Sequence, residues 1–211
     1  MLFSIIVPVY NRPAEIEDLL KSLAAQTDKG FELVVVEDGS TVRCEEQCRQ
    51  FADKIRLKYI YKNNEGRSIA RNHGIDGADG DFFIFVDSDC ILPPDYIEAL
   101  RKSLSATPTD CFGGPDAAHS SFSDTQKAIN YAMTSFLTTG GIRGGKMCME
   151  KFTPRTFNMG FSRKVYELVG GFRFSKPLEL LHRCFGYHFV NIWSLLNEKL
   201  HLLYYNRYEY N

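Results

Sequence analysis

Short apolar runs alternate with segments of helical spacing through the first half of this chain. Runs of apolar residues over 3–9, 31–36 and 82–86 predict three buried strands, and period-two alternation over 55–62 predicts a fourth strand with one less buried face. Apolar residues three and four apart predict helices between and after these strands. Four such helices are expected: after Pro13, around Cys44 to Phe51, over 65–78, and from Pro94 to Leu104.

The start of the first helix carries additional features. Asn11 offers a side chain that can cap the helix, and Pro13 has a backbone suited to a first helical turn. Glu15, Glu17 and Asp18 follow near the N-terminal end, where the helix dipole favours acidic side chains. We therefore expect a helix to begin at this proline.

Repeated strand, loop and helix units predict an α/β protein with a parallel sheet covered on both faces. In such sheets, ligands bind beyond the carboxyl ends of the strands. Three polar clusters follow predicted strands: Tyr10-Asn11, Glu37-Asp38-Gly39-Ser40 and Asp87-Ser88-Asp89. We expect the three clusters to converge on one edge of the sheet.

The second half of the chain is less regular. A helix is predicted over 125–137, a glycine-rich stretch follows at 140–146, and a short helix is expected between 156–161 and Gly170-Gly171-Phe172. After Phe172 the composition changes to leucine, histidine, tyrosine and asparagine, with few acidic residues.

Composition places the chain among ordinary globular proteins. It has 211 residues, of which 44% are hydrophobic and 24% charged, and a formal net charge of −1. These proportions exclude a disordered, collagen-like or low-complexity chain. The near-zero charge gives no support for a nucleic-acid partner, because phosphate binding normally requires a basic excess.

Two features bear on the cellular compartment. No apolar run approaches the roughly 20 residues that span a bilayer, and the N-terminal segment lacks the basic region and cleavage site of a signal peptide. The six cysteines have no framework spacing, so we expect them to be reduced in the cytoplasm. Cys44 and Cys48 lie four apart, but no histidine pair completes a zinc site, and two buried thiols are expected there.

The polar clusters suit specific chemistry. Asp87 and Asp89 offer two carboxylates to a hard divalent cation, which shares oxygen ligands with phosphates; the alternative is a strand-end aspartate that caps the next helix. Asp38 can accept from a ring N–H of a ligand, or belong to an Asp-Gly turn. Arg67 and Arg71 lie one helical turn apart and either face an anion as a pair or form a solvated basic face.

Five ordered segments resemble the nucleotide-sugar-binding half and the acceptor landmarks of inverting family 2 glycosyltransferases with the GT-A fold. They are Ser4–Arg12, Val35–Ser40, Asn64–Gly66 with Ala70–Asn72, Gly80–Asp89, and Asn158–Gly160 with Val169–Phe172. The resemblance implies a Rossmann-like α/β fold with a mixed, mostly parallel sheet. It also implies a nucleotide-sugar-binding half over 1–105 and an acceptor-binding half over 106–211 of the same domain, with an atypical tail after about 172.

The resemblance implies roles for individual residues. Asp38 is expected to hydrogen-bond the base, usually uracil in this family, and Asp89 to bind Mn²⁺ or Mg²⁺, with Asp87 on the ribose or metal side. The residues implied for the nucleotide sugar as a whole are Pro8, Tyr10, Asn11, Asp38, Arg67, Arg71, Asp87 and Ser88. The metal bridges the diphosphate and neutralises charge on the leaving group.

The implied reaction is transfer of a sugar from a UDP-sugar donor to an acceptor hydroxyl, with inversion. The family suggests a saccharide or lipid-linked acceptor and a role in cell-surface polysaccharide synthesis at the cytoplasmic face of the membrane. Peripheral membrane association is one interpretation of the tyrosines in the tail; a packed or disordered tail is the other.

The general base is the point at which the resemblance fails. The acidic pair that supplies it in the family falls here on Lys176-Pro177, and Glu179 is the nearest substitute, with His182 as an alternative. Three explanations remain open: a catalytically impaired nucleotide-sugar-binding homologue, a truncated or frame-shifted product, and a diverged but working site.

Two further patterns allow other interpretations. Gly140 to Lys146 has the spacing of a phosphate-binding loop, but Met147 stands where a serine or threonine would hold magnesium, so a lid over the donor site is the better interpretation. His201 offers a third metal ligand, or an ordinary surface histidine.

Overall fold

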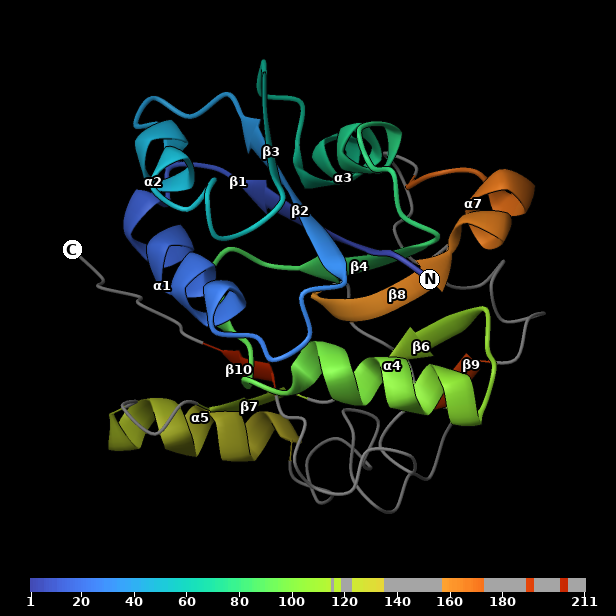
Figure 1. The fold of residues 1–211 in the computed structure, drawn as a ribbon. Helices are drawn as coiled ribbons and strands as arrows, with labels where there is room; N and C mark the ends of the chain where they lie inside the picture. Colours follow the sequence, from blue (N-terminus) through green and yellow to red (C-terminus); the bar gives the residue numbers. More distant parts are fainter. Residues whose placement is uncertain (115, 119–122, 135–156, 173–188, 192–201, 205–211) are drawn as a thin grey trace.

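The structure is a computed structural model that describes residues 1–114, 116–118, 123–134, 157–172, 189–191 and 202–204 (Figure 1). A seven-stranded sheet forms its centre, in the order β3-β2-β1-β4-β8-β6-β9. β8 runs antiparallel to both of its neighbours, and the other pairings in this sheet are parallel. The strands are β1 (Phe3–Val9), β2 (Phe31–Asp38), β3 (Leu57–Lys62), β4 (Phe82–Val86), β6 (Cys111–Gly113), β8 (Asn158–Ser162) and β9 (Phe189–Asn191).

A second, three-stranded sheet has the order β5-β10-β7. Its strands are β5 (Cys90–Ile91), β10 (Leu202–Tyr204) and β7 (Asp116–Ala118), and β5 begins directly after the acidic cluster that follows β4. The described helices are α1 (Pro13–Ala24), α2 (Glu45–Arg49), α3 (Arg67–Asp76), α4 (Tyr96–Ala106), α5 (Asp124–Thr134) and α7 (Arg163–Val169).

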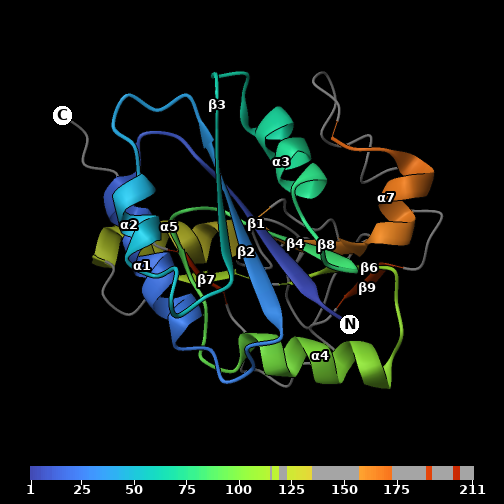
Figure 2. The same cartoon turned by 45° about the horizontal axis from the view of Figure 1, so that its top comes forward.

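The apolar core has two parts, one on each face of the large sheet. Along β1, the odd-numbered residues Phe3, Ile5, Val7 and Val9 join a cluster with α1, α2 and α4, whereas Ile6 joins a cluster with α3 and α7. This division follows from the period-two alternation of side chains along a strand. The helices therefore cover the sheet from both sides, with α3 and α7 opposite α1 and α2 (Figures 1 and 2).

The expected α/β architecture is confirmed, and the strand at Phe3–Val9 has the predicted bounds. β2, β3 and β4 and the helices α1 to α4 lie where the apolar spacing predicts them. The mixed sheet expected from the family resemblance is also confirmed, since β8 enters against the direction of β4. Gly160 permits this entry, because a Cβ there would lie 2.4 Å from the Phe112 ring and 2.7 Å from a carbonyl of β4.

One local prediction is wrong. The N-cap of α1 is Arg12, no side chain caps this helix, and Asn11 instead adopts a positive φ of 54°. Its side-chain oxygen accepts hydrogen bonds from the backbone N–H groups of Thr41 and Val42, in the loop after β2. Asparagine tolerates this left-handed conformation better than most residues, which explains its use at the turn.

The topology positions the site. β2, β1 and β4 are neighbours and run parallel, so the polar clusters that follow them meet at one edge of the sheet. The chain leaves β1 toward β2 on one side and returns to β4 on the other, which makes this edge a topological switch point. Among the described residues, no helix is both long and apolar enough to span a membrane.

Candidate functional site

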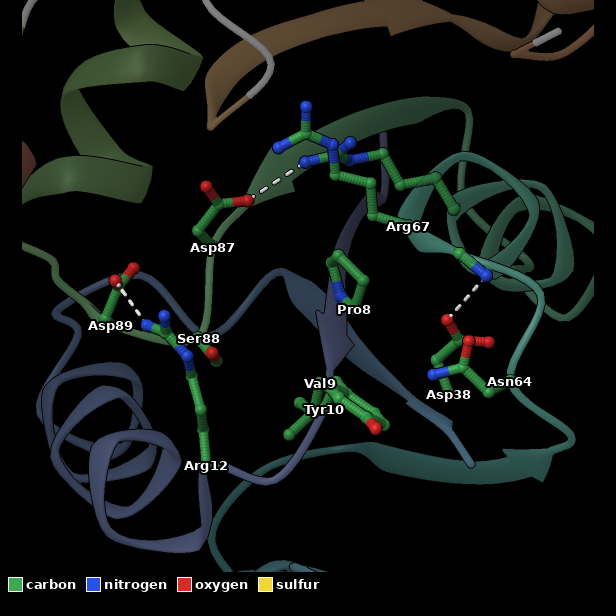
Figure 3. A pocket seen from close by; sticks show the side chains of 12 residues that line it. Pro8, Val9, Tyr10, Arg12, Asp38, Asn64, Arg67, Asp87, Ser88 and Asp89 are labelled. Atoms are coloured by element: carbon green, nitrogen blue, oxygen red, sulfur yellow. Dashed lines mark hydrogen bonds and ion pairs between the residues drawn. The ribbon is translucent and has the colours of Figure 1, made fainter. Parts of the chain in front are cut away.

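A cavity of about 430 Å³ opens at the carboxyl ends of β1, β2 and β4 (Figure 3). Its lining combines two buried carboxylates, two arginines from α3 and an aromatic ring from the loop after β1. The lining residues are Pro8, Val9, Tyr10, Arg12, Asp38, Asn64, Gly66, Arg67, Arg71, Asp87, Ser88 and Asp89. The three polar clusters that the sequence singled out therefore share one cavity, which has the concave shape of a small-molecule site.

Asp38 ends β2 and lies at one end of this cavity. The residue is only 4% exposed, and its Oδ1 accepts from Lys62 Nζ at 2.7 Å and from the backbone N–H of Glu65 at 3.0 Å. Its Oδ2 accepts from the backbone N–H of Gly66 at 2.8 Å. Burial by itself raises the pKa of Asp38, but these hydrogen bonds outweigh it and hold the pKa below its ordinary value. Asp38 is therefore a fixed, ionised acceptor.

Two glycines allow the backbone to surround Asp38 in this way. Gly39 has a φ of +73°, and a Cβ there would lie 2.4 Å from the backbone nitrogen of Asn64. Gly66 has a φ of +94° and forms the N-cap of α3, which turns its N–H toward Asp38. Any other residue at position 39 would be strained and would collide with the neighbouring turn.

Glu37 anchors two loops next to Asp38. It is fully buried, and its carboxylate accepts from the hydroxyl of Ser40, from the hydroxyl of Tyr59 at 3.0 Å, and from the backbone N–H of Cys44 at 2.8 Å. Ser40 Oγ in turn accepts from the backbone N–H of Asn11 at 2.7 Å. This chain of bonds joins the loop that carries Tyr10 to the loop that follows β2.

Arg71 and Asp87 form an ion pair in the cavity wall. The Arg71 side chain is 3% exposed, and its Nη2 donates to Asp87 Oδ1 at 2.9 Å. Its Nε has no hydrogen-bond partner within the described part of the chain, and burial lowers the pKa of this arginine. Arg67, one turn earlier on α3, is exposed and brings a second guanidinium to the same wall (Figure 3).

The landmark Gly170-Gly171-Phe172 packs against this arginine. The Phe172 ring is 3% exposed, lies 5.7 Å from the Arg71 guanidinium carbon and contacts Phe85 of β4 at a centroid distance of 5.0 Å. The Asn72 side chain holds its backbone in place, accepting from the Phe172 N–H and donating to the Phe172 carbonyl, each at 2.7 Å. Phe172, from the second half of the chain, thus packs against α3 and supports Arg71 in the cavity wall.

Asp89 lies at the other end of the cavity. It is 3% exposed, and its Oδ2 accepts from Arg12 Nη1 at 2.7 Å. Its Oδ1 is buried and has no hydrogen-bond partner among the described residues. Burial and the nearby charge of Asp87 raise the pKa of Asp89, against the lowering effect of Arg12. A cation bound at Oδ1 would therefore stabilise the charged form of Asp89.

This donor set fits a divalent cation. Hard cations such as Mg²⁺ and Mn²⁺ take carboxylate oxygens and commonly use only one or two of them, completing their coordination with substrate phosphates and water. Asp89 Oδ1 supplies an available oxygen and Asp87 lies nearby on the same loop. The described residues contain no cluster of three acidic, histidine or cysteine ligands that would hold a metal without a substrate.

Not every predicted residue reaches the cavity. Asn11 is not among the lining residues, because its side chain is committed to the loop after β2. Glu179, His182, His201 and the glycine-rich stretch 140–146 lie outside the described residues. The four cysteines that the structure describes are buried, and none forms a disulfide.

The structure adds roles that the sequence pattern did not assign. Lys62 is the buried ammonium beside Asp38, and Glu37 is the buried anchor of two loops. The signal that places Lys62 there is the register of the parallel pairing between β2 and β3, which sets Asp38 and Lys62 at facing positions. Arg12 is also the cation beside Asp89, a role that the sequence did not indicate.

Comparison with known proteins identifies relatives for most of this chain. The sequence profile described as "Glycosyl transferase family 2" matches residues 4–169. Over 102 residues the chain is 42% identical to "Glycosyltransferase GlyA" of Streptococcus pneumoniae, an alignment that covers 48% of this chain and 15% of that protein. It is 34% identical over 103 residues to "Validoxylamine A glucosyltransferase" of Streptomyces hygroscopicus, covering 47% of this chain and 24% of that protein. These alignments span less than a third of either relative.

Solved structures share the fold. The crystal structure of S. aureus TarS 1-349 in complex with UDP-GlcNAc superposes with a TM-score of 0.74 at 21% identity, covering 98% of this chain and 59% of that one. The mannosyltransferase PcManGT from Pyrobaculum calidifontis, in complex with GDP-Man and Mn²⁺, superposes with a TM-score of 0.66 at 19% identity, covering 90% and 54%. At such identities the likeness establishes the architecture alone.

Proposed function

The chain belongs to glycosyl transferase family 2, and from this premise we propose that it transfers a sugar from a uridine diphosphate donor to an acceptor hydroxyl, with inversion at the anomeric carbon. The observation that carries the proposal is the pair of buried carboxylates, Asp38 and Asp89, at the two ends of one cavity. The first suits a base and the second suits a metal bound to a diphosphate, so their places at opposite ends of the cavity support a nucleoside diphosphate as the ligand.

At the base end, Asp38 accepts the ring N–H of uracil. Its fixed position and its lowered pKa support this role, because an ionised acceptor that does not move binds a neutral donor without reorganisation. Pro8 and Tyr10 line the same end, and the Tyr10 side chain is half exposed, so its ring can cover the nucleoside. Aromatic rings stack favourably on nucleobases.

In the middle of the cavity, Arg67 and Arg71 face the diphosphate. Arg71 Nε is buried without a hydrogen-bond partner in the described chain, and an anion within reach would satisfy it. Guanidinium groups bind phosphates through paired N–H donors, and a second guanidinium from the same helix reinforces the charge. Asp87 restrains Arg71 and lies toward the ribose or the metal.

Asp89, together with Asp87, would hold the divalent cation, Mn²⁺ or Mg²⁺. When bound, such a cation acts as a Lewis acid that neutralises the charge developing on the leaving diphosphate. The contribution of the chain is a buried Asp89 oxygen that has no hydrogen-bond partner among the described residues, next to the Arg12 guanidinium on the other oxygen.

The acceptor half, residues 106–211, binds the hydroxyl that attacks the anomeric carbon from the face opposite the diphosphate. A general base within hydrogen-bond reach of that hydroxyl removes its proton, and Glu179 is our candidate for this residue. We propose a saccharide or lipid-linked acceptor, cell-surface polysaccharide synthesis, and a cytoplasmic site of action with peripheral contact at the inner face of the membrane.

Calorimetry tests the donor site directly. UDP titrated into the 211-residue chain is expected to bind with Mn²⁺ present and more weakly with EDTA, and Asp89→Ala should remove the Mn²⁺-dependent part. An exposed aspartate away from the cavity gives a matched control, Asp53→Ala, which should leave the titration unchanged. Binding that is unaffected by Asp89→Ala would refute the metal role.

A second function is favoured by the sequence position of Lys176-Pro177, where the family carries its acidic pair. It is metal-dependent nucleotide-sugar binding without transfer. Release of UDP from UDP-sugars, measured with saccharide acceptors present, separates the two: turnover abolished by Glu179→Gln supports transfer, whereas tight binding without turnover supports a binding protein.

A further inference from the structure

Lys62, the last residue of β3, is a buried lysine with no spare hydrogen-bonding capacity. Its side chain is 7% exposed, and its ammonium contacts three oxygens: Asp38 Oδ1 at 2.7 Å, the Asn63 carbonyl at 2.5 Å and Glu65 Oε2 at 2.9 Å. A lysine ammonium has three donors. All three are therefore used within the protein, and any effect of Lys62 on a ligand passes through Asp38.

The hydrogen-bond acceptors of Asp38 are nearly filled as well. A carboxylate oxygen accepts about two hydrogen bonds, and Oδ1 already accepts from Lys62 and from the backbone N–H of Glu65. Among the residues that the structure describes, Oδ2 accepts only from the backbone N–H of Gly66. One acceptor position, on Oδ2, is left for a ligand.

We propose that Lys62 is a specificity-determining residue, which restricts Asp38 to a single free acceptor position and thereby selects a base that presents one ring N–H. This inference rests on the proposed function, since it takes Asp38 as the acceptor for the base. It goes further because it assigns the choice between bases to a residue that does not touch the nucleotide.

The chemistry of the bases explains the selection. Uracil presents a single N–H between two carbonyl groups, and one acceptor position satisfies it. Guanine presents a ring N–H beside an exocyclic amino group, and a carboxylate binds both through its two oxygens. With Oδ1 filled, one of the two guanine donors would be buried without a partner, which costs about tenfold in affinity.

Position 62 is well suited to this control. Parallel pairing of β2 and β3 sets Lys62 opposite Asp38, so the contact is built into the sheet and does not depend on a loop. Burial also excludes water that could replace the ammonium. Opposing a wrong ligand by filling its binding position is an established route to specificity.

Calorimetric competition between UDP and GDP, with Mn²⁺ present, tests the proposal. The 211-residue chain should bind UDP at least about tenfold more tightly than GDP. In Lys62→Met, which keeps length and apolar volume but removes the donor, this ratio should fall at least about fivefold, mainly through tighter GDP binding. Lys62→Arg restores a charged donor and should restore the ratio.

Glu65→Gln is the matched control, because it alters the exposed partner of Lys62 and leaves Asp38 Oδ1 filled. Its UDP to GDP ratio should equal that of the unaltered chain. If Lys62→Met unfolds, Lys62→Leu provides a second variant at the same position that carries no hydrogen-bond donor.

The outcomes separate the inference from the function. An unchanged ratio in a folded Lys62→Met, or an equal loss of both nucleotides, overturns the specificity role and leaves nucleotide-sugar binding intact. If the unaltered chain binds UDP and GDP equally, or prefers GDP, the specificity role is likewise overturned and nucleotide-sugar binding is left intact. Binding of neither nucleotide by the unaltered chain would instead refute the proposed function.

Discussion

Asp38 and Asp89 occupy the two ends of one cavity and are buried to the same extent, yet the protein treats their charges in opposite ways (Figure 3). Asp38 accepts three hydrogen bonds, one from a buried lysine, and its pKa is lowered. Asp89 accepts one side-chain hydrogen bond, keeps an oxygen without a partner in the described chain, and its pKa is raised.

The difference follows from what each residue is proposed to bind. A base is a neutral donor, so the carboxylate that receives it can be neutralised by the protein itself during folding. A metal brings its own positive charge, and a fully paired carboxylate would have to lose its partners before binding it. An ionised oxygen that lacks a partner costs stability in the free protein and favours the cation.

The largest predicted effect is at Asp38, the carboxylate that is ion-paired with Lys62. Asp38→Asn breaks a buried ion pair and leaves the Lys62 ammonium without its closest anion, which should lower the free energy of unfolding by about 3 kcal/mol. Urea unfolding measures this change. Glu65→Gln, which removes the half-exposed partner of the same lysine, should change it by no more than about 1 kcal/mol. Equal losses in the two variants would show that Asp38 is not the main counter-charge.

Asp89→Asn should show the reverse pattern. The affinity for UDP in the presence of Mn²⁺ is expected to fall about a hundredfold, whereas stability in EDTA should stay unchanged or rise by up to about 1 kcal/mol. Calorimetry and thermal unfolding on the same preparation provide both measurements. A variant that loses stability in EDTA as Asp38→Asn does would contradict the contrast between the two ends.

The two variants should also differ in their pH dependence. A lowered pKa stabilises the fold above the ordinary value of 3.8 and loses that effect as the pH falls through the folded-state pKa, so the deficit of Asp38→Asn should shrink only below about pH 4. The raised pKa of Asp89 means that its charged form destabilises the fold at high pH. Protonation on acidification removes this destabilisation. Any gain in Asp89→Asn should therefore be largest near neutral pH and vanish as the pH approaches 3.8.

Urea unfolding of both variants and the unaltered chain, in EDTA from about pH 3 to about pH 8, tests this directly. For each variant, the free energy of unfolding relative to the unaltered chain is plotted against pH. The Asp38→Asn difference should be negative at neutral pH, any Asp89→Asn difference should be positive, and the two should approach each other in acid. Parallel curves would mean that burial alone governs both carboxylates.

The convergence of the polar clusters was predictable because it depends only on strand direction. Apolar runs such as 3–9 and 82–86 fix which segments are buried strands, and parallel strands bring the residues that follow them to one edge. Asp38 is the last residue of β2, and Asp89 lies in the short turn between β4 and β5, so both carboxylates lie at that edge. Local pattern was sufficient for the architecture and for most of the cavity lining.

The partners of these residues were not predictable in the same way. The alternation over 55–62 indicates a strand but not the register that sets Lys62 beside Asp38. Asn11 is a residue type that commonly caps helices. Its side chain instead accepts from Thr41, a residue 30 positions later in the loop after β2. The Asn72 clamp on Phe172 joins residues 100 apart. Such pairings depend on tertiary packing, which periodicity does not encode.

The smallest predicted effect concerns Arg12, the guanidinium beside Asp89. Its side chain is 36% exposed, so the pair is partly screened and Arg12→Gln should lower stability in EDTA by only about 0.5 kcal/mol. With Mn²⁺ and UDP bound, the cation takes over the neutralisation of Asp89, and the difference between variant and unaltered chain should disappear. Thermal unfolding in the two conditions measures this, with Arg12→Lys as the variant that keeps the charge. A deficit that persists at saturating Mn²⁺ and UDP would mean that Arg12 anchors the start of α1, and that the unpaired oxygen of Asp89 does not depend on it.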